Sequence, residues 1–434
     1  MILYRILYML FIGSYLLLLR LASIWNPKAR LWINGRKKIL AKLNHDLQGE
    51  TAEIIWMHCA SLGEYEQGRP ILNKLRTLYP RYKILLTFFS PSGYMVIKDI
   101  AIADYIYYLP FGNRLIASQF IQIAKPLLVL WIKYDYWYYY LHELNKRNIP
   151  LLLISGNFQK DQTFFKWYGE MHRNMLGCFT HLFVQTGHSK NLLSRIGLAE
   201  YSTISGDTRF DRVIEIAEQF EPIEIFEKFC GNNKVIVAGS TWPEDEEELD
   251  HFANIHTEIK FIIAPHEIEE FHLREVEKLF KRSIRFSILQ NQIFNGQWPK
   301  TENISNDQED TPNVLIIDNI GMLSRLYKYA TITYVGGGFG ESGVHNVLEA
   351  AVFGKPVIFG PVFNKYIEAI ELLEEGGAYT IDNALELEKI LNDLLSDSQL
   401  YLEVCESARA YVISKKGATE KILKYIQEKR LLTN

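Results

Sequence analysis

Cysteine is scarce in this chain of 434 residues. Its four cysteines, at positions 59, 178, 230 and 405, are too few and too scattered for a disulfide framework, and none belongs to a CxxC pair. The chain also lacks an HExxH motif and a paired-carboxylate metal pattern, so we expect neither a bound metal nor a cofactor. Its 48% hydrophobic and 23% charged residues exclude a disordered chain, a collagen-like fibre and a multi-span membrane protein.

Acidic residues are absent from residues 1–45, which carry eight lysines and arginines. Residues 46–205 carry 16 basic and 12 acidic side chains, whereas residues 206–434 carry 23 basic and 39 acidic ones. This asymmetry suggests that the front half of the chain faces an anionic partner. A solvated charge bias without a partner is the alternative.

A hydrophobic stretch opens the chain. Residues 6–25 contain one charge, Arg20, and a helix of this length would span about 30 Å, the thickness of a bilayer core. Trp25 suits an interfacial position, and the basic cluster at 28–38 places the rest of the chain in the cytoplasm by the positive-inside rule. We expect a single inner-membrane anchor; an interfacial helix and a cleaved signal peptide are the alternatives.

Beyond residue 50, short apolar runs alternate with helix-length amphipathic segments, and this pattern restarts near residue 234. It predicts two doubly wound, Rossmann-like α/β domains with ligands at the carboxyl ends of their strands. The expected parts are the anchor and basic segment (1–45), an N-terminal α/β domain (46–205), a linker (206–232) and a C-terminal α/β domain (233–434). Residues 290–312 read as a surface loop. GT-B glycosyltransferases and sugar-nucleotide epimerases share this build, and architecture alone does not choose between them.

Glycines cluster in the segment 333–361, TYVGGGFGESGVHNVLEAAVFGKPVIFGP. A strand runs into the glycine-rich turn, and a helix is expected to start near Val344. The glycines, among them Gly338 and Gly343, let the backbone approach a ligand, and the following helix start suits a phosphate. Glu349 can then accept hydrogen bonds from ribose hydroxyls. A turn that serves only close packing is the alternative.

Three other segments carry candidate chemistry. Glu64 follows a buried strand in the sequence SLGE, where it can act as a general base or simply stabilise the helix start. Ser240 or Thr241 is expected to cap the helix near Pro243, and this junction can also bind a phosphate. Arg209, in GDTRFD, is either a cation near the ligand or part of a surface ion pair.

In these motifs the chain resembles the 3-deoxy-D-manno-octulosonic acid (Kdo) transferases of lipid A assembly. The resemblance covers nearly the whole chain in the same order: SLGE (61–64), TFFSPSGY (87–94), YLPF (108–111), IPLLLISGNF (149–158), GDTRFD (206–211), AGST (238–241), DNIGML (318–323) and the glycine-rich segment. The family implies a GT-B fold and inverting transfer of Kdo from CMP-Kdo to a lipid A precursor, typically without metal.

The resemblance also implies roles for individual residues. Glu64 matches the catalytic base, and Arg209 matches a lysine thought to stabilise the transition state. The CMP contacts are matched by Pro265, His266, Ile320, Gly321, Met322, Asn346, Val347, Leu348 and Glu349.

The chain departs from the family pattern at three places. His266 stands where arginine is usual, and Met322 stands where glutamate is usual. In Lys133–Tyr139, which replaces a Glu-Thr-Glu-Leu-Trp-Pro-Asn stretch, Asp135 keeps the second carboxylate and Lys133 reverses the first.

The sequence thus predicts an inverting glycosyltransferase of the inner membrane. Its expected partners are CMP-Kdo, a lipid A precursor and anionic lipids, and we expect no nucleic acid. The alternatives are a membrane-associated GT-B enzyme that uses a UDP-sugar and a non-catalytic homologue that binds lipid or nucleotide.

Overall fold

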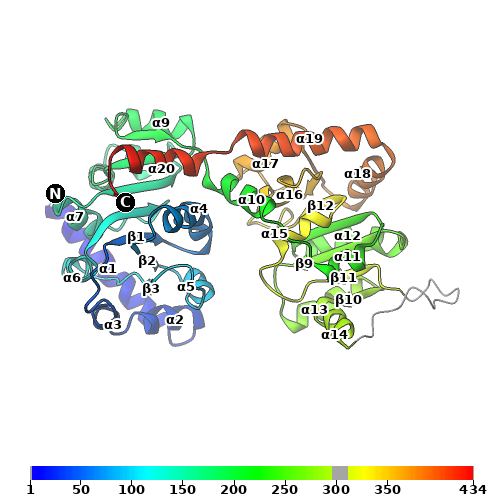
Figure 1. Ribbon diagram of the computed structural model, residues 1–434, viewed down its shortest axis with the longest axis horizontal. Helices are drawn as coiled ribbons and strands as arrows, with labels where there is room; N and C mark the ends of the chain where they lie inside the picture. Colours follow the sequence, from blue (N-terminus) through cyan, green and yellow to red (C-terminus); the bar gives the residue numbers. More distant parts are fainter. Residues whose placement is uncertain (1, 296–310, 434) are drawn as a thin grey trace. The chain divides into compact units, whose positions relative to one another are not determined.

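The computed structural model describes residues 2–295 and 311–433, and the chain divides into two compact units (Figure 1). Unit 1 comprises Met1–Arg212 and Gly417–Asn434, and unit 2 comprises Val213–Lys416. Each unit contains one seven-stranded parallel sheet with helices packed against it, which is the doubly wound arrangement that the sequence predicts.

The sheet of unit 1 has the order β3-β2-β1-β4-β5-β6-β7. Its strands are β1 (Ile54–Cys59), β2 (Lys83–Phe88), β3 (Tyr105–Tyr108), β4 (Pro126–Ile132), β5 (Leu151–Gly156), β6 (His181–Val184) and β7 (Ser202–Ile204). Every residue of β1 and β5 is buried, as expected for central strands covered on both faces. The short edge strand β7 was not predicted, because Ser202–Ile204 lacks an apolar run.

The helices of unit 1 connect these strands and cover the sheet. They are α1 (Ile2–Ala22), α2 (Pro27–Gly35), α3 (Ile39–Asp46), α4 (Leu62–Leu78), α5 (Pro91–Ile97), α6 (Arg114–Ala124), α7 (Tyr138–Lys146), η1 (Thr163–Phe165), α8 (Glu170–Leu176), α9 (Gly187–Ser194), α10 (Thr208–Glu218), which continues into unit 2, and α20 (Ala418–Glu428).

The sheet of unit 2 has the order β10-β11-β9-β8-β12-β13-β14. Its strands are β8 (Val235–Thr241), β9 (Lys260–Pro265), β10 (Ser283–Arg285), β11 (Val314–Ile316), β12 (Ile332–Val335), β13 (Val357–Phe359) and β14 (Ala378–Thr380). Strands β10 and β14 were not predicted, because each has three residues and no continuous apolar run.

The helices of unit 2 are α11 (Glu224–Cys230), α12 (Pro243–Ile255), α13 (Glu270–Leu279), α14 (Phe286–Phe294), α15 (Leu323–Leu326), η3 (Tyr327–Tyr329), α16 (Leu348–Ala351), α17 (Ile367–Glu374), α18 (Ala384–Ser396) and α19 (Ser398–Ser414). Helix α14 takes up the start of the predicted loop 290–312, whose residues 296–310 lie outside the described residues.

The domain borders differ from those expected at both crossings between the units. Residues 206–232 form no separate linker, because the division falls between Arg212 and Val213, inside α10. The last helix, α20, belongs to unit 1 and not to the C-terminal domain (red in Figure 1). Ile422 and Ile426 are fully buried in the hydrophobic core of unit 1, and this burial accounts for the return of the chain.

Helix α1 packs one face against unit 1. The ring of Tyr8 lies 5.4 Å from that of Tyr138, and the ring of Tyr15 lies 5.5 Å from that of Phe111. Ile12, on the packed face, is 4% exposed. The other face carries apolar side chains that are about half exposed or more: Leu7, Leu10, Leu17, Leu18 and Leu21.

None of the helices in residues 2–295 and 311–433 combines the length and the apolar character needed to cross a membrane. The predicted membrane-spanning anchor at residues 6–25 is therefore not supported.

Candidate functional site

Glu64 lies directly after β1, in the first turn of α4. Its Oε2 accepts a hydrogen bond from the Ser61 backbone N–H (3.0 Å) and another from the Ser61 hydroxyl. The bond from the Ser61 N–H is part of a capping box, and the two contacts together fix the helix start and the direction of the carboxylate. The two interpretations of Glu64 are therefore compatible: the side chain stabilises the helix and stays half-buried at the carboxyl end of β1.

Arg209 lies at the start of α10 and forms a two-point ion pair with Asp207. Its Nε and Nη2 are 2.8 and 2.7 Å from Oδ2 of Asp207, whose Oδ1 accepts the Arg209 backbone N–H at 2.9 Å. The Arg209 side chain is 25% exposed, so the cation is held in a fixed position and still reaches solvent. The ion pair that the sequence allowed is present, and it orients the guanidinium.

The start of α10 is fastened to the helix that carries Glu64. The Thr208 hydroxyl donates to the Gln67 carbonyl oxygen (2.6 Å), and Arg212 pairs with Glu66 at 3.1 Å. These contacts place the GDTRFD segment against α4. Glu64 and Arg209 are thus brought to one region of unit 1, although 145 positions separate them in the sequence.

Tyr134 belongs to the same region and was assigned no role from the sequence. Burial raises the pKa of its phenol, the negative charges of Asp207 and Glu64 add to that rise, and the Arg209 guanidinium opposes it. Its side chain is 42% exposed. The preceding residue, Lys133, has a φ of 60°, a left-handed conformation that turns the chain at the end of β4.

Asp135 faces a buried histidine. Its Oδ2 lies 3.5 Å from Nε2 of His58, a side chain of β1 that is fully buried. Nδ1 of His58 lies 2.9 Å from the Thr87 hydroxyl. The structure therefore keeps Asp135 at the carboxyl ends of β1 and β4, where a second carboxylate was expected.

One basic residue of residues 1–45, Arg36, has a structural role. Arg36 donates hydrogen bonds to the backbone carbonyl oxygens of Leu109 and Phe89, at 2.9 and 2.6 Å, and its guanidinium lies 3.7 Å from the centre of the Trp32 ring. Burial lowers the pKa of Arg36 to about 9. Part of the positive charge of residues 1–45 is therefore internal, and only the remaining part is available to an anionic partner.

In unit 2 the candidate residues gather at the carboxyl ends of adjacent strands. His266 follows β9, and its backbone N–H donates to the Thr241 carbonyl oxygen at the end of β8 (2.9 Å). The expected cap of α12 is different: Trp242 is the N-cap residue, and Thr241 donates its hydroxyl to Glu246 at 2.8 Å. Ser240, the last residue but one of β8, has a φ of 54°, in the left-handed region. Pro265, which is buried, ends β9.

The glycine-rich turn joins this group through its backbone. Gly336 donates to the Gly239 carbonyl oxygen at 2.9 Å and accepts from the His345 N–H at 3.0 Å. A Cβ on Gly338 would lie 2.5 Å from the backbone nitrogen of Gly360, and Gly343 has a φ of 81°. Glycine is therefore required at both positions by close packing and by backbone conformation.

The helix after this turn begins later than predicted. Residues 343–346 are extended or irregular, and α16 covers only Leu348–Ala351, so no helix starts at Val344. The prediction of a helix start near Val344 is therefore wrong, and the phosphate site expected there stays a prediction. Asn346 lies before α16 and donates its side-chain amide to Glu349 at 3.0 Å, while Val347 and Leu348 are buried.

Three rings, of Trp242, His266 and His345, form a stacked cluster, which we call the ring cluster. The His266 ring stacks on Trp242 and on His345, with centroids 4.7 and 4.6 Å apart. Nε1 of Trp242 donates to Nε2 of His345 at 3.1 Å. Burial, with a smaller contribution from His266, lowers the pKa of His345 to about 4, so this imidazole accepts the indole N–H as a neutral ring. Trp242 and His345 were not predicted as site residues, although His345 lies within the glycine-rich segment 333–361 and Trp242 directly follows the AGST motif.

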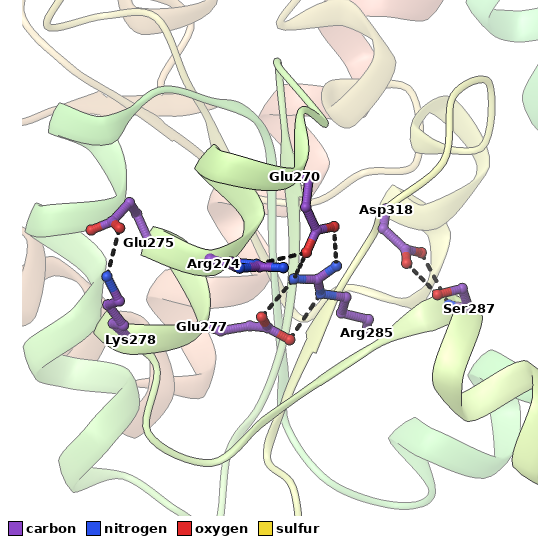
Figure 2. A network of polar contacts seen from close by, with 8 residues as sticks. All are labelled: Glu270, Arg274, Glu275, Glu277, Lys278, Arg285, Ser287 and Asp318. Atoms are coloured by element: carbon purple, nitrogen blue, oxygen red, sulfur yellow. Dashed lines mark hydrogen bonds and ion pairs between the residues drawn. The ribbon is translucent and has the colours of Figure 1, made fainter.

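The DNIGML segment follows β11. Ile320 is 84% exposed and Gly321 has a φ of 95°. Figure 2 shows Asp318 directed at Ser287 of α14, and the Ser287 N–H donates to the Asp318 carboxylate at 3.0 Å. Met322 lines an open pocket of about 510 Å³ together with residues of α11 and α14.

An ion-pair network joins β10 and α13 of unit 2. Arg285 contacts Glu277 and Glu270 at 2.7 Å each, which ties β10 to α13 (Figure 2). Among the described residues, no group of three or more His, Cys, Asp or Glu side chains is arranged to hold a metal ion.

These two parallel sheets, with polar and glycine-rich segments at their carboxyl ends, define a GT-B-like α/β protein. A solved UDP-GlcNAc 2-epimerase from Neisseria meningitidis, bound to UDP-GlcNAc, has the same fold, with a TM-score of 0.61 and 16% identity over 87% of this chain and 100% of that one.

Sequence comparisons find similarity to one family of transferases. Residues 34–212 match the family model described as 3-deoxy-D-manno-octulosonic-acid transferase (kdotransferase). The 3-deoxy-D-manno-octulosonic acid transferase of Aquifex aeolicus is 28% identical over 362 residues, 79% of this chain and 86% of the relative. That of Chlamydia trachomatis serovar A is 25% identical over 366 residues, 81% and 80% of the two chains. The resemblance in the motifs is confirmed: residues 34–212 match the Kdo transferase family model, and the chain is similar to curated Kdo transferases over most of its length.

A further relative is longer than this chain. A bifunctional glycosyltransferase/methyltransferase of Fusobacterium nucleatum is 27% identical over 395 residues. The alignment covers 86% of this chain and 57% of that relative.

Proposed function

We propose that this protein transfers Kdo from CMP-Kdo to a sugar hydroxyl of a lipid A precursor, with inversion and without a metal. The observation that carries the proposal is the cluster of Glu64, Arg209 and Asp207 in unit 1, held in place by the contacts between α10 and α4. It is supported by the match of residues 34–212 to the Kdo transferase family model and by curated relatives that are named for Kdo transfer.

In the proposed reaction Glu64 accepts the proton of the acceptor hydroxyl, and the oxygen attacks the anomeric carbon of Kdo. The bond between that carbon and the phosphate oxygen breaks, and CMP leaves with the bonding electrons. General base catalysis of this kind typically contributes about 10²–10⁴-fold. Arg209, oriented by Asp207, is a fixed cation that can offset negative charge developing in the transition state.

The donor is assigned to unit 2, at the carboxyl ends of β8, β9, β11 and β12. A ribonucleotide needs three kinds of contact, and unit 2 offers each of them. The glycine-rich turn allows close approach of the backbone, the ring cluster allows stacking, and the carboxylate of Glu349 can accept hydrogen bonds from ribose. The short α16 contributes no helix-start site to this assignment.

We also propose that α1 attaches the protein to the cytoplasmic face of the inner membrane by lying in the interface. The packed face of α1 holds it to unit 1, and the exposed leucines of the other face are at helical spacing. The basic side chains of residues 28–42 other than Arg36 then add attraction to anionic lipids.

The direct test is a transfer assay with CMP-Kdo and a tetra-acylated lipid A precursor in detergent. Kdo-bearing product from wild type, with none from Glu64→Gln, is the expected result. Product from a UDP-sugar but not from CMP-Kdo would replace the donor assignment, and no transfer from either donor would contradict an enzymatic function.

A further inference from the structure

Asp245 is a fully buried carboxylate in the first turn of α12, beside the candidate nucleotide site. Burial raises the pKa of Asp245, and the hydrogen bonds it accepts act in the opposite direction. A buried carboxylate is costly unless its oxygens are satisfied. Its partners therefore indicate what the side chain does.

One oxygen of Asp245 joins two strand ends. Oδ2 accepts the backbone N–H of Trp242, after β8, at 2.9 Å, and the backbone N–H of Gly337, after β12, at 2.8 Å. Oδ1 accepts the hydroxyl of Tyr334, within β12, at 2.8 Å. The carboxylate thus links the start of α12 to the glycine-rich turn, which lies 92 residues further along the chain.

The glycine-rich turn fits closely around this carboxylate. A Cβ on Gly336 would lie 2.8 Å from Oδ2 of Asp245 and 2.4 Å from the carbonyl oxygen of Ser240. Gly337 has a φ of 88°, a conformation in which its N–H meets the carboxylate. Trp242, on the same oxygen, also donates through its indole to His345. Asp245 therefore contacts both the turn and the ring cluster.

We propose that Asp245 is a positioning residue for the nucleotide site: by holding the Gly337 and Trp242 amides on one oxygen, it sets the glycine-rich turn and the ring cluster in the arrangement that binds the donor. This inference rests on the proposed function for the identity of the nucleotide. It does not depend on that function for the mechanical role of the carboxylate.

A simpler role is helix capping alone, since Asp245 is the third residue of α12 and completes a capping box. The two roles separate in Asp245→Glu, because glutamate is the usual residue at this position of a capping box. The longer side chain keeps the cap and displaces the oxygen from Gly337. Asp245→Asn removes the charge: its one side-chain oxygen can take the place of Oδ2, but both amide hydrogen bonds then lose the charge that strengthens them.

The test measures two quantities on the full-length protein in detergent. Hydrogen exchange followed by mass spectrometry reports the protection of residues 336–345 without any ligand, and calorimetric titration with CMP reports the dissociation constant. In both variants we expect exchange in this segment to be at least about tenfold faster, and CMP binding to be about tenfold weaker or more, as for the loss of a hydrogen bond to a charged group.

Two neighbouring variants serve as controls. Tyr334→Phe removes the partner of Oδ1 and leaves both amides on Oδ2, and Glu246→Gln changes a buried carboxylate whose partners are Thr241 and His272. Both controls should keep exchange in the turn and CMP affinity within about twofold of wild type.

Unchanged exchange and unchanged CMP affinity in Asp245→Asn and Asp245→Glu would overturn the inference. If Asp245→Asn fails to fold, Asp245→Glu decides alone. Wild-type protein that binds no CMP would contradict the proposed function, and the exchange measurement would still decide the role of Asp245.

Discussion

The candidate sites of the two units use different chemistry at the same edge of similar sheets. In unit 1 the site consists of charged side chains held by other side chains: Glu64 by Ser61, and Arg209 by Asp207. In unit 2 it consists of backbone and rings, with Gly337 and Trp242 held on a buried carboxylate. The parallel sheet supplies the location in both cases, and the residues after the strands determine what the location can do.

This difference predicts a separation of functions. Charged groups that change protonation or offset developing charge affect turnover, whereas shape and stacking affect binding. Substitutions in unit 1 should therefore lower kcat with little change in nucleotide affinity, and substitutions in unit 2 should do the reverse. The predictions below test that separation.

Replacing the proposed base should have the largest effect. Glu64→Gln keeps a capping-box residue, so α4 should form as before, and it removes the proton acceptor. We expect transfer to fall about 10²–10⁴-fold with an unchanged dissociation constant for CMP. Glu170→Gln, at an exposed carboxylate in the first turn of α8, is the matched control and should transfer within a few-fold of wild type. Transfer by Glu64→Gln at the level of this control would exclude the role.

Removing the Arg209 cation should have the next largest effect. Arg209→Gln should lower kcat about 10²-fold, because a fixed cation no longer offsets charge in the transition state. Arg209→Lys should restore most of the loss, as the family match to lysine implies. Arg212→Gln, which breaks the pair with Glu66 on the same helix, controls for ion-pair loss. If Arg209→Gln and Arg212→Gln lose activity equally, Arg209 has only a structural role.

A substitution in unit 2 should act on binding. Glu349→Ala should weaken CMP binding by about 1.5–3 kcal/mol if a hydrogen bond to ribose is lost, and kcat at saturating donor should stay near that of wild type. Calorimetric titration with CMP measures the effect, and Glu341→Ala, an exposed residue of the glycine-rich turn, is the control. An unchanged affinity in Glu349→Ala would contradict the assignment.

The sequence predicted the longer strands, and it predicted that Glu64 follows a strand and that Glu349 follows the glycine-rich turn. The buried strands of both sheets carry continuous apolar runs, and Glu64 and Glu349 lie next to strands or turns that their motifs marked. Three of the four sheet edges were missed, because β7, β10 and β14 have three residues each, lack a continuous apolar run and are placed by pairing with a neighbour. A short strand of this kind has no local signal.

The features that could not be predicted depend on contacts between segments that are distant in the sequence. Helix α20 reads as the end of the C-terminal domain, and only the burial of Ile422 and Ile426 shows that it belongs to unit 1. Asp245 reads as an ordinary acidic residue of a first turn, and its bond to Gly337 appears only when β8 and β12 lie side by side. Apolar composition alone also could not distinguish a spanning helix from α1, which packs one face on the protein.

The exposed face of α1 should contribute modestly to membrane attachment. Leu17 is 58% exposed, and Leu17→Ala removes apolar surface that the interface would cover, so binding to vesicles with anionic lipid should weaken about fivefold. Leu402→Ala, at an equally exposed leucine of α19, is the control and should have no effect. Vesicle flotation measures both variants, and equal flotation of Leu17→Ala and wild type would contradict the interfacial assignment of α1.

The smallest expected effect is on stability in acid, and it can be compared between one histidine of each unit. His181 of unit 1 stacks on Tyr425 of α20 at 4.4 Å, and burial, with the nearby charges of Lys429 and Lys190, lowers its pKa to about 4. The unfolded chain binds a proton near pH 6.5 and the folded chain only near pH 4, so stability is present above pH 6.5 and falls as the pH drops through this window. His345 of unit 2 has the same depressed pKa. Wild-type protein should lose unfolding free energy between pH 7 and pH 5, and in His181→Gln we expect this loss to be smaller by about 1 kcal/mol. Hydrogen exchange at pH 5 should show the added protection in unit 1, including α20. In His345→Gln the added protection from exchange should appear in unit 2. Added protection that is equal in both units, in either variant, would show that the two units unfold as one cooperative body.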